Sequence, residues 1–124
     1  MGKKILVVDD EKAIREPLVE MLTRQGYEAL QAEDGKKGLE ESKKKKPDLI
    51  LLDVNMPKMD GFKVLAELKK DRKTSDIPVF MLTSRSSAED VAAGISGFAE
   101  KYIPKPFDFA LLMAEIQKTL SLKG

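Results

Sequence analysis

Residues 47–57 read Pro47-Asp48-Leu49-Ile50-Leu51-Leu52-Asp53-Val54-Asn55-Met56-Pro57, and they carry the strongest structural signal in the chain. The uninterrupted apolar run at residues 49–52 predicts a strand buried on both faces, as the central strand of a parallel sheet is. This strand ends in a carboxylate, Asp53. Because ligands of open α/β sheets bind at the carboxyl ends of the strands, Asp53 is a candidate functional residue. An aspartate close to a proline could also be an ordinary turn residue.

Composition excludes several classes of site and partner. A length of 124 residues predicts one domain, residues 1–124, with no need of disulfides, and the chain has no cysteine. It has no histidine either, so any metal is expected to be a hard cation bound by oxygen. The formal net charge of +1 gives no reason to expect direct binding of nucleic acid or of a membrane. The apolar run at residues 5–8 is too short for a signal peptide, so we expect a cytoplasmic protein.

Short apolar runs alternate with helical patterns along the chain. Besides residues 49–52, strands are predicted at residues 5–8, 27–32, 78–82 and 102–104. Apolar residues at helical spacing predict the intervening helices. Ile14, Leu18, Met21 and Leu22 define the first helix, which ends at Gly26, and the second helix covers residues 35–45 with Leu39. Phe62, Leu65, Ala66 and Leu68 define the third helix, and the fourth is a weak helix with residues 87–90, interrupted by Gly94 and Gly97. The last helix is capped by Asp108 and carries Leu111, Leu112, Ile116 and Leu120. Pro17 should bend or loosen the first helix. The four lysines at residues 43–46 are either the solvated end of the second helix or a binding site for a polyanion.

These five β-α units, (βα)5, predict a doubly wound parallel sheet with helices on both faces. All strands of a parallel sheet end at the same edge. We therefore expect one cluster to contain Asp9, Asp10, Asp53, Thr83 and Lys105, which all follow or end predicted strands.

The chemistry of this cluster favours phosphoryl transfer. Three neighbouring carboxylates repel one another, and a divalent cation, of which Mg²⁺ is the favoured choice, relieves that repulsion. A cation site, a hydroxyl and an ammonium around a strand-end carboxylate supply the positioning and charge that phosphoryl transfer needs. Each residue alone has a simpler explanation: Asp9 or Asp10 could cap a helix, Thr83 could be a strand-end hydroxyl, and Lys105 could be solvated.

Four motifs together resemble the receiver domain of two-component response regulators. They are Val8-Asp9-Asp10-Glu11, Leu52-Asp53-Val54-Asn55-Met56-Pro57-Lys58-Met59-Asp60-Gly61, Leu82-Thr83-Ser84 and Tyr102-Ile103-Pro104-Lys105-Pro106-Phe107. The resemblance spans residues 3 to about 122. It implies the flavodoxin-like strand order 2-1-3-4-5.

The resemblance assigns an acceptor and a metal site. Asp53 matches the phosphoacceptor, which takes a phosphoryl group from a histidine kinase or a histidine phosphotransfer protein. Asp10 matches the principal Mg²⁺ ligand, Asp9 the outer acidic residue, and Asn55 a ligand through its backbone carbonyl. Such a domain is a signalling switch and not an enzyme, since it catalyses only its own aspartyl phosphorylation and dephosphorylation.

The resemblance also assigns the switch. Lys105 matches the lysine that pairs with phosphoryl oxygens, and its peptide bond to Pro106 is expected to be cis. Thr83 matches the switch hydroxyl and Tyr102 the aromatic residue that follows it. Phosphorylation is then expected to change the surface of the fourth helix, the fifth strand and the fifth helix, which binds an output partner or an effector domain. We expect a monomer or a weak phosphorylation-dependent dimer, either a stand-alone receiver or part of a longer regulator.

Three other functions are compatible with parts of the pattern. A flavodoxin-type nucleotide binder needs a Gly/Ser/Thr-rich loop after the first strand, where Asp9-Asp10-Glu11 would repel phosphate. A haloacid-dehalogenase-like phosphatase needs a second aspartate where Asn55 stands. A receiver-like interaction module that is never phosphorylated is disfavoured by the intact set of Asp10, Asp53, Thr83 and Lys105.

Overall fold

The structure is a computed structural model that describes residues 2–54, 56, 61–83 and 99–122. Its strands are β1 (Lys4–Val8), β2 (Glu28–Ala32), β3 (Leu49–Asp53), β4 (Val79–Thr83) and β5 (Lys101–Pro104). Its helices are α1 (Lys12–Arg24), α2 (Gly35–Lys45), α3 (Gly61–Lys70) and α5 (Phe109–Leu122). The predicted fourth helix, with Gly94 and Gly97, lies outside the described residues. Within the described part of the chain, no helix has the length and apolar character needed to cross a membrane.

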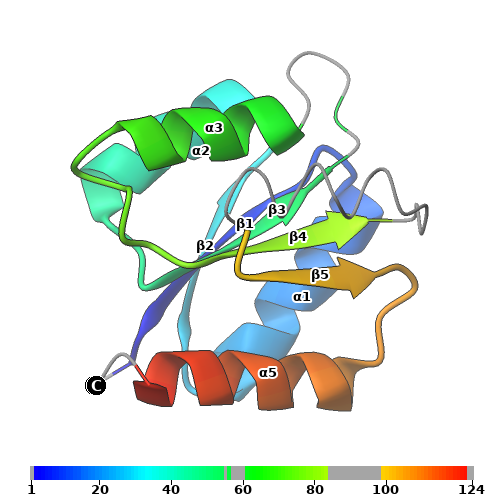
Figure 1. The fold of residues 1–124 in the computed structure, drawn as a ribbon. Helices are drawn as coiled ribbons and strands as arrows, with labels where there is room; N and C mark the ends of the chain where they lie inside the picture. The colour runs from blue at the N-terminus through cyan, green and yellow to red at the C-terminus, as the bar shows by residue number, and fades with distance from the viewer. Residues whose placement is uncertain (1, 55, 57–60, 84–98, 123–124) are drawn as a thin grey trace.

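The strands form one parallel sheet in the order β2-β1-β3-β4-β5 (Figure 1). This confirms the predicted doubly wound architecture. The uninterrupted apolar run of β3 stands at the centre of the sheet, and all five of its residues are buried. β2, with its partly alternating pattern, is an edge strand, as predicted.

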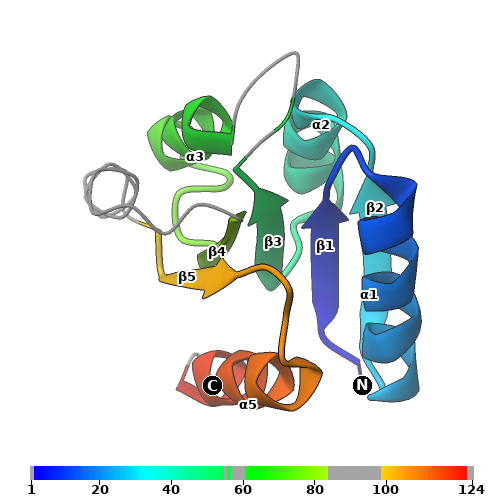
Figure 2. The ribbon, with the colours of Figure 1, turned by 90° about the vertical axis from the view of Figure 1, so that its right-hand side faces the viewer.

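Helices lie on both sides of the sheet (Figure 2). Side chains that alternate along the strands build two separate cores, one on each face. Leu6, Ile50 and Leu52 pack on one face with Val64, Leu65 and Leu68 of α3 and with the half-buried Leu39 of α2. Ile5, Leu49 and Leu51 pack on the other face with Leu18 and Leu22 of α1 and with Leu112 and Ile116 of α5. Helices therefore cover both faces, and the sheet edge is left for polar side chains.

Two of the apolar residues that define the predicted helices lie outside the core. Leu111 of α5 is 63% exposed, and Met113 is buried in its stead, because the core-facing stripe starts at Leu112. In α3, Ala66 is exposed and Val64 is buried. Successive helical residues are about 100° apart, so one position in the stripe separates core from solvent.

Local signals define the helix ends, as predicted for Gly26 and Asp108 but not for Asp34. Asp34 accepts a hydrogen bond from the Lys37 N–H at the start of α2, and Asp108 Oδ1 accepts one from the Leu111 N–H at the start of α5. Gly26 follows the end of α1 with a φ of 93°, a conformation that favours glycine. α1 continues past Pro17 to Arg24, and the lysines at residues 43–46 are all exposed.

Leu111 and Leu112 form a matched pair for testing the register of α5. Leu112→Ala should lower the free energy of unfolding by about 2–5 kcal/mol, because it leaves a cavity in the core. Leu111→Ala should change it by no more than about 0.5 kcal/mol, since this side chain is exposed. Urea unfolding of both variants measures the difference. Equal losses would contradict this register.

Candidate functional site

Three carboxylates meet at the carboxyl edge of the sheet. β1 and β3 are neighbours paired through Val8 and Leu52, so the residues that follow this pair, Asp9 and Asp53, come side by side. One oxygen from each of Asp9, Asp10 and Asp53 lies within 4.8 Å of the others. Asp9 and Asp53 are fully buried, whereas Asp10 is exposed. The predicted convergence of these three side chains is therefore present in the structure.

Lys105 brings a positive charge into this acidic cluster from the loop after β5. Its Nζ lies 3.0 Å from Asp53 Oδ1 and 3.3 Å from Asp9 Oδ2, and its side chain is only 13% exposed. The backbone N–H of Lys105 donates to the Thr83 carbonyl at 2.8 Å, and the peptide bond to Pro106 is cis. Burial disfavours the charged ammonium, but the hydrogen bonds and charges of Asp53 and Asp9 outweigh it and raise the pKa of Lys105.

Thr83 and Tyr102 lie on neighbouring strands and share one face of the sheet. Thr83 is the buried last residue of β4 and pairs with Pro104, while Met81 pairs with Tyr102. Residues two positions apart on a strand point to the same face, so Thr83 and Tyr102 are diagonal neighbours. Tyr102 is half-buried and packs against the core on the α3 side.

Asn55, the predicted backbone ligand, lies outside the described residues. Val54 and Gly61, on either side of it, are held by backbone hydrogen bonds. The Val54 N–H donates to the Leu82 carbonyl and the Gly61 N–H donates to the Val54 carbonyl, both at 2.9 Å. A Cβ placed on Gly61 would lie 2.8 Å from Val54 Cα and closer still to the Asp53 carbonyl oxygen. From sequence, Gly61 is named only within the motif at residues 52–61, and the close approach of Gly61 to β3 was missed.

Sequence reasoning also missed Arg15 of α1. Its Nη1 donates to the backbone carbonyl of Asp9 at 2.8 Å, and its Nε donates to Gln31 Oε1 at 2.9 Å. The signal that could have found it is its position about one helical turn after the acidic residues that close β1.

The donor set of this cluster suits a hard divalent cation. Asp9, Asp10 and Asp53 offer only carboxylate oxygens, the ligand type that Mg²⁺ and Ca²⁺ prefer. Lys105 pairs with Asp9 and Asp53, and even with the nearby guanidinium of Arg15 the three carboxylates keep an excess of negative charge. A cation would therefore be drawn to the cluster by unbalanced charge as well as by ligand chemistry.

The sequence profile of the response regulator receiver domain matches residues 5–117. The chain belongs to the receiver domain family of two-component response regulators. Domains of this family are signalling switches, so the family that the sequence motifs resemble is confirmed at that level.

Curated relatives share the receiver domain over nearly all of this chain. The probable transcriptional regulator ycf27 of Porphyridium aerugineum is 42% identical over 118 residues, which are 95% of this chain and 48% of that protein. The DNA-binding dual master transcriptional regulator RpaA of Synechocystis sp. is 40% identical over 117 residues, which are 94% of this chain and 48% of that protein. The chain thus spans about half the length of these relatives.

Solved receiver structures confirm the fold. The chemotaxis protein CheY4 of Vibrio cholerae has a TM-score of 0.91 at 33% identity, over 96% of this chain and 99% of that chain. A CheY-like receiver domain protein of Methanospirillum hungatei has a TM-score of 0.91 at 30% identity, over 98% of this chain and 95% of that chain. The flavodoxin-like order 2-1-3-4-5 is that of this receiver fold.

Replacing Lys105 should expose the repulsion between the carboxylates of Asp9 and Asp53 as a loss of stability. In buffer with a chelator, Lys105→Gln should lower the free energy of unfolding by about 1–3 kcal/mol, because two buried carboxylates lose their charged partner. Lys101→Gln is the matched control: this lysine pairs with Glu115 at 2.8 Å, but both side chains are more exposed. Its loss should be at most about 1 kcal/mol. Similar losses for both variants in urea unfolding would contradict a special role for Lys105.

Proposed function

We propose that this receiver domain stores a signal as an aspartyl phosphate on Asp53. The phosphoryl group comes from the phosphohistidine of a histidine kinase or a histidine phosphotransfer protein. The observation that carries the proposal is the position of Lys105 Nζ, within 3.3 Å of both Asp9 and Asp53 at the end of β3. A buried carboxylate with a fixed ammonium beside it is suited to hold an anionic group.

In the proposed reaction, an Asp53 carboxylate oxygen attacks phosphorus and the bond from phosphorus to the imidazole nitrogen breaks. The imidazole leaves with the bonding electrons and returns to its neutral form on gaining a proton. Lys105 holds the phosphoryl oxygens by charge and hydrogen bonding. Asp9, Asp10, Asp53 and the Asn55 carbonyl would hold Mg²⁺. When bound, Mg²⁺ supplies positive charge that offsets the charge of the phosphoryl oxygens.

Removing the acceptor carboxylate tests this assignment. Wild-type protein treated with acetyl phosphate and Mg²⁺ should gain one phosphoryl group by mass spectrometry, and Asp53→Asn should gain none. Asp48→Asn is the control. It alters the other end of the β3 segment, where Asp48 Oδ2 accepts the Lys4 N–H at 2.8 Å, and should leave phosphorylation unchanged. An unmodified wild type would overturn the proposal, as would sustained turnover of a phosphomonoester, which indicates a phosphatase.

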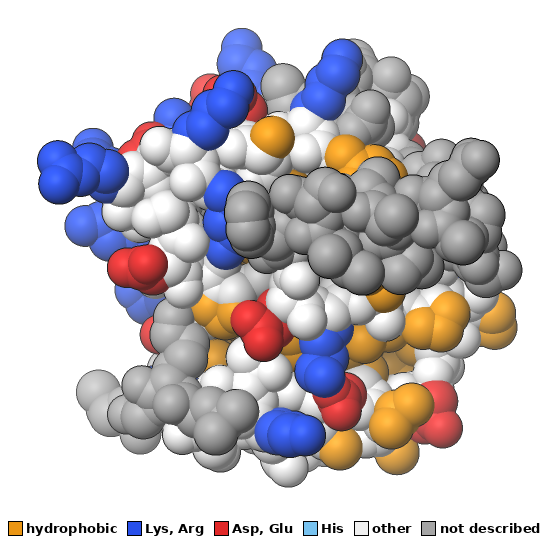
Figure 3. Space-filling view, in the orientation of Figure 1, with side chains coloured by type: hydrophobic (Ala, Val, Ile, Leu, Met, Phe, Trp, Pro, Cys, Tyr) orange, Lys and Arg blue, Asp and Glu red, His pale blue; other side chains and the backbone are white. Residues whose placement is uncertain are grey.

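The output of the switch is proposed to lie on the surface of the fourth helix, β5 and α5. Phosphorylation adds roughly two negative charges at Asp53, and the Thr83 hydroxyl then donates to a phosphoryl oxygen. Tyr102, the diagonal neighbour of Thr83, moves into the volume that Thr83 leaves. Tyr102 and the exposed Leu111 line a pocket of about 570 Å³ between β5 and α5, and Figure 3 shows hydrophobic side chains at this surface. A change at Tyr102 therefore reaches a surface fit for an apolar partner.

The coupling of Thr83 to Tyr102 can be read from tyrosine fluorescence. The chain has two tyrosines and no tryptophan, so Tyr27→Phe leaves Tyr102 as the single reporter. Beryllium fluoride with Mg²⁺ should change the Tyr102 emission in this background. Thr83→Ala should remove most of that change while Asp53 is still phosphorylated by acetyl phosphate, and Thr83→Ser should retain it because it keeps the hydroxyl. An unaltered response in Thr83→Ala would refute the coupling.

The wider setting follows from these assignments. We propose that residues 1–124 act as one receiver domain in the cytoplasm, as a monomer or a weak phosphorylation-dependent dimer. Its output is a partner protein or an effector domain, and the receiver itself binds neither nucleic acid nor membrane. The names of the relatives as transcriptional regulators support an effector that acts on DNA in those proteins.

A further inference from the structure

Asp9 is anchored through every polar group it has. Its N–H donates to the Ala32 carbonyl at 3.1 Å, its Oδ1 accepts the Glu11 N–H at 2.9 Å, and its Oδ2 lies 3.3 Å from Lys105 Nζ. The remaining group, its carbonyl oxygen, accepts Arg15 Nη1 at 2.8 Å. This last bond fixes the orientation of the peptide group that joins Asp9 to Asp10.

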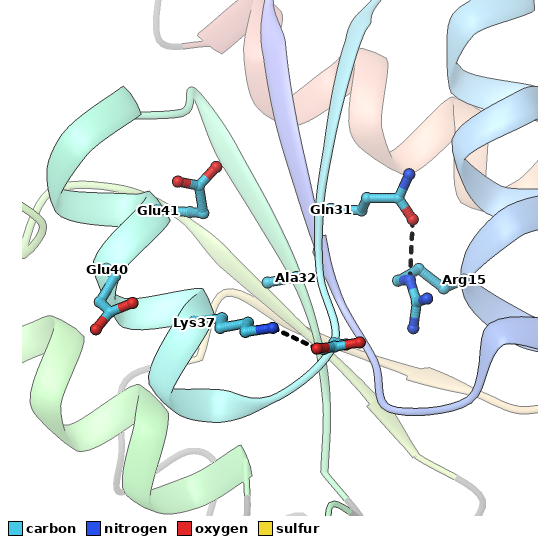
Figure 4. A pocket seen from close by; sticks show the side chains of 7 residues that line it. Arg15, Gln31, Ala32, Lys37, Glu40 and Glu41 are labelled. Atoms are coloured by element: carbon cyan, nitrogen blue, oxygen red, sulfur yellow. Dashed lines mark hydrogen bonds and ion pairs between the residues drawn. The ribbon is translucent and has the colours of Figure 1, made fainter.

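The guanidinium of Arg15 is itself held in a defined orientation. Its Nε donates to Gln31 Oε1 on β2 at 2.9 Å, and Figure 4 shows the two side chains directed toward one another. The backbone of Arg15 is held as well, because its backbone N–H donates to the Glu11 carbonyl at 2.9 Å in the first turn of α1. Because the guanidinium is planar and its Nε is bound to Gln31, its hydrogen bond to the Asp9 carbonyl has a defined direction, which a lysine cannot reproduce.

Asp10 depends on this arrangement more than its neighbour does. Its side chain is exposed, and among the described residues no hydrogen bond or ion pair holds its carboxylate, although one of its oxygens lies within 4.8 Å of those of Asp9 and Asp53. The backbone of Asp10 therefore determines where its carboxylate can reach, and the hydrogen bond to the Asp9 carbonyl orients that backbone.

The geometry points to Arg15 as a positioning residue that aims the Asp10 carboxylate into the divalent cation site. This inference rests on the proposed function, because it assumes that the acidic cluster binds Mg²⁺. Two effects of Arg15 have opposite signs. Its positive charge near three carboxylates disfavours a cation, whereas its hydrogen bond to Asp9 favours cation binding by holding the ligands in place. The structure assigns the larger effect to the hydrogen bond. Gln31 and Asp9 both bind the guanidinium, whereas Arg15 is only half-buried, so solvent weakens the effect of its charge.

The test compares Mg²⁺ affinity among variants of the full chain, measured by calorimetric titration. Arg15→Gln removes the charge and the guanidinium, and Arg15→Lys keeps the charge but loses the geometry. Both should weaken Mg²⁺ binding by about tenfold, the usual size of an effect transmitted through a ligand's supporting residue. Gln31→Leu, which keeps Arg15 but frees its guanidinium, should cause a smaller loss. Arg24→Gln is the control for charge: Arg24 pairs with Glu20 on the same helix, and its variant should bind Mg²⁺ as the wild type does.

The spectra of the metal-free proteins give a second readout. In ¹⁵N correlation spectra, Arg15→Lys and Arg15→Gln should shift the Asp10 amide, and Arg24→Gln should not. If Arg15→Gln binds Mg²⁺ more tightly and Arg15→Lys binds it normally, Arg15 acts through charge and the inference is overturned. It is also overturned if both variants bind Mg²⁺ normally and differ from wild type only in unfolding free energy. A wild type that does not bind Mg²⁺ at all would instead defeat the proposed cation site, and the inference with it.

Discussion

Repulsion among three carboxylates at one sheet edge is the constraint on which this site depends. Asp9 and Asp53 are buried, and their burial makes the repulsion stronger than it would be in water. Lys105 pairs with two of these carboxylates and the guanidinium of Arg15 lies at the Asp9 carbonyl, so two positive charges near three negative ones still leave the cluster negative. Replacing Asp53 would lower this repulsion, but it would also remove the proposed phosphoacceptor. The arrangement is therefore suited to a function that brings in a cation.

The fold allows this unfavourable arrangement because its stability is built elsewhere. The two apolar cores lie on the faces of the sheet, and β1, β3 and β4 are buried along nearly all their length. The edge is then free to carry polar groups from strands that are far apart in sequence. The same backbone also links the groups: the Lys105 N–H binds the Thr83 carbonyl, and the Val54 N–H binds the Leu82 carbonyl. Backbone hydrogen bonds thus connect the segments that carry Asp53, Thr83 and Lys105.

Much of this could be predicted from sequence because the strands have strong local signals. The apolar run of β3 and the acidic residues after β1 predict both the parallel sheet and the meeting of their carboxylates at one edge. The failures have a common cause. Leu111 and Leu112 are both apolar, and which of them faces the core depends on how α5 packs against the sheet. Gly61 and Arg15 act on residues at the ends of β3 and β1 through backbone contacts that hydrophobic patterning does not record.

The most direct test of the account is the free energy of unfolding as a function of Mg²⁺ concentration at constant ionic strength. If the carboxylate cluster is an unbalanced cation site, stability should rise with Mg²⁺, approaching about 1.4 kcal/mol for each tenfold increase above the dissociation constant. Asp10→Asn should reduce this dependence, because one ligand and one negative charge are lost. A wild-type stability that does not change with Mg²⁺, or that changes equally with sodium chloride, would contradict the account.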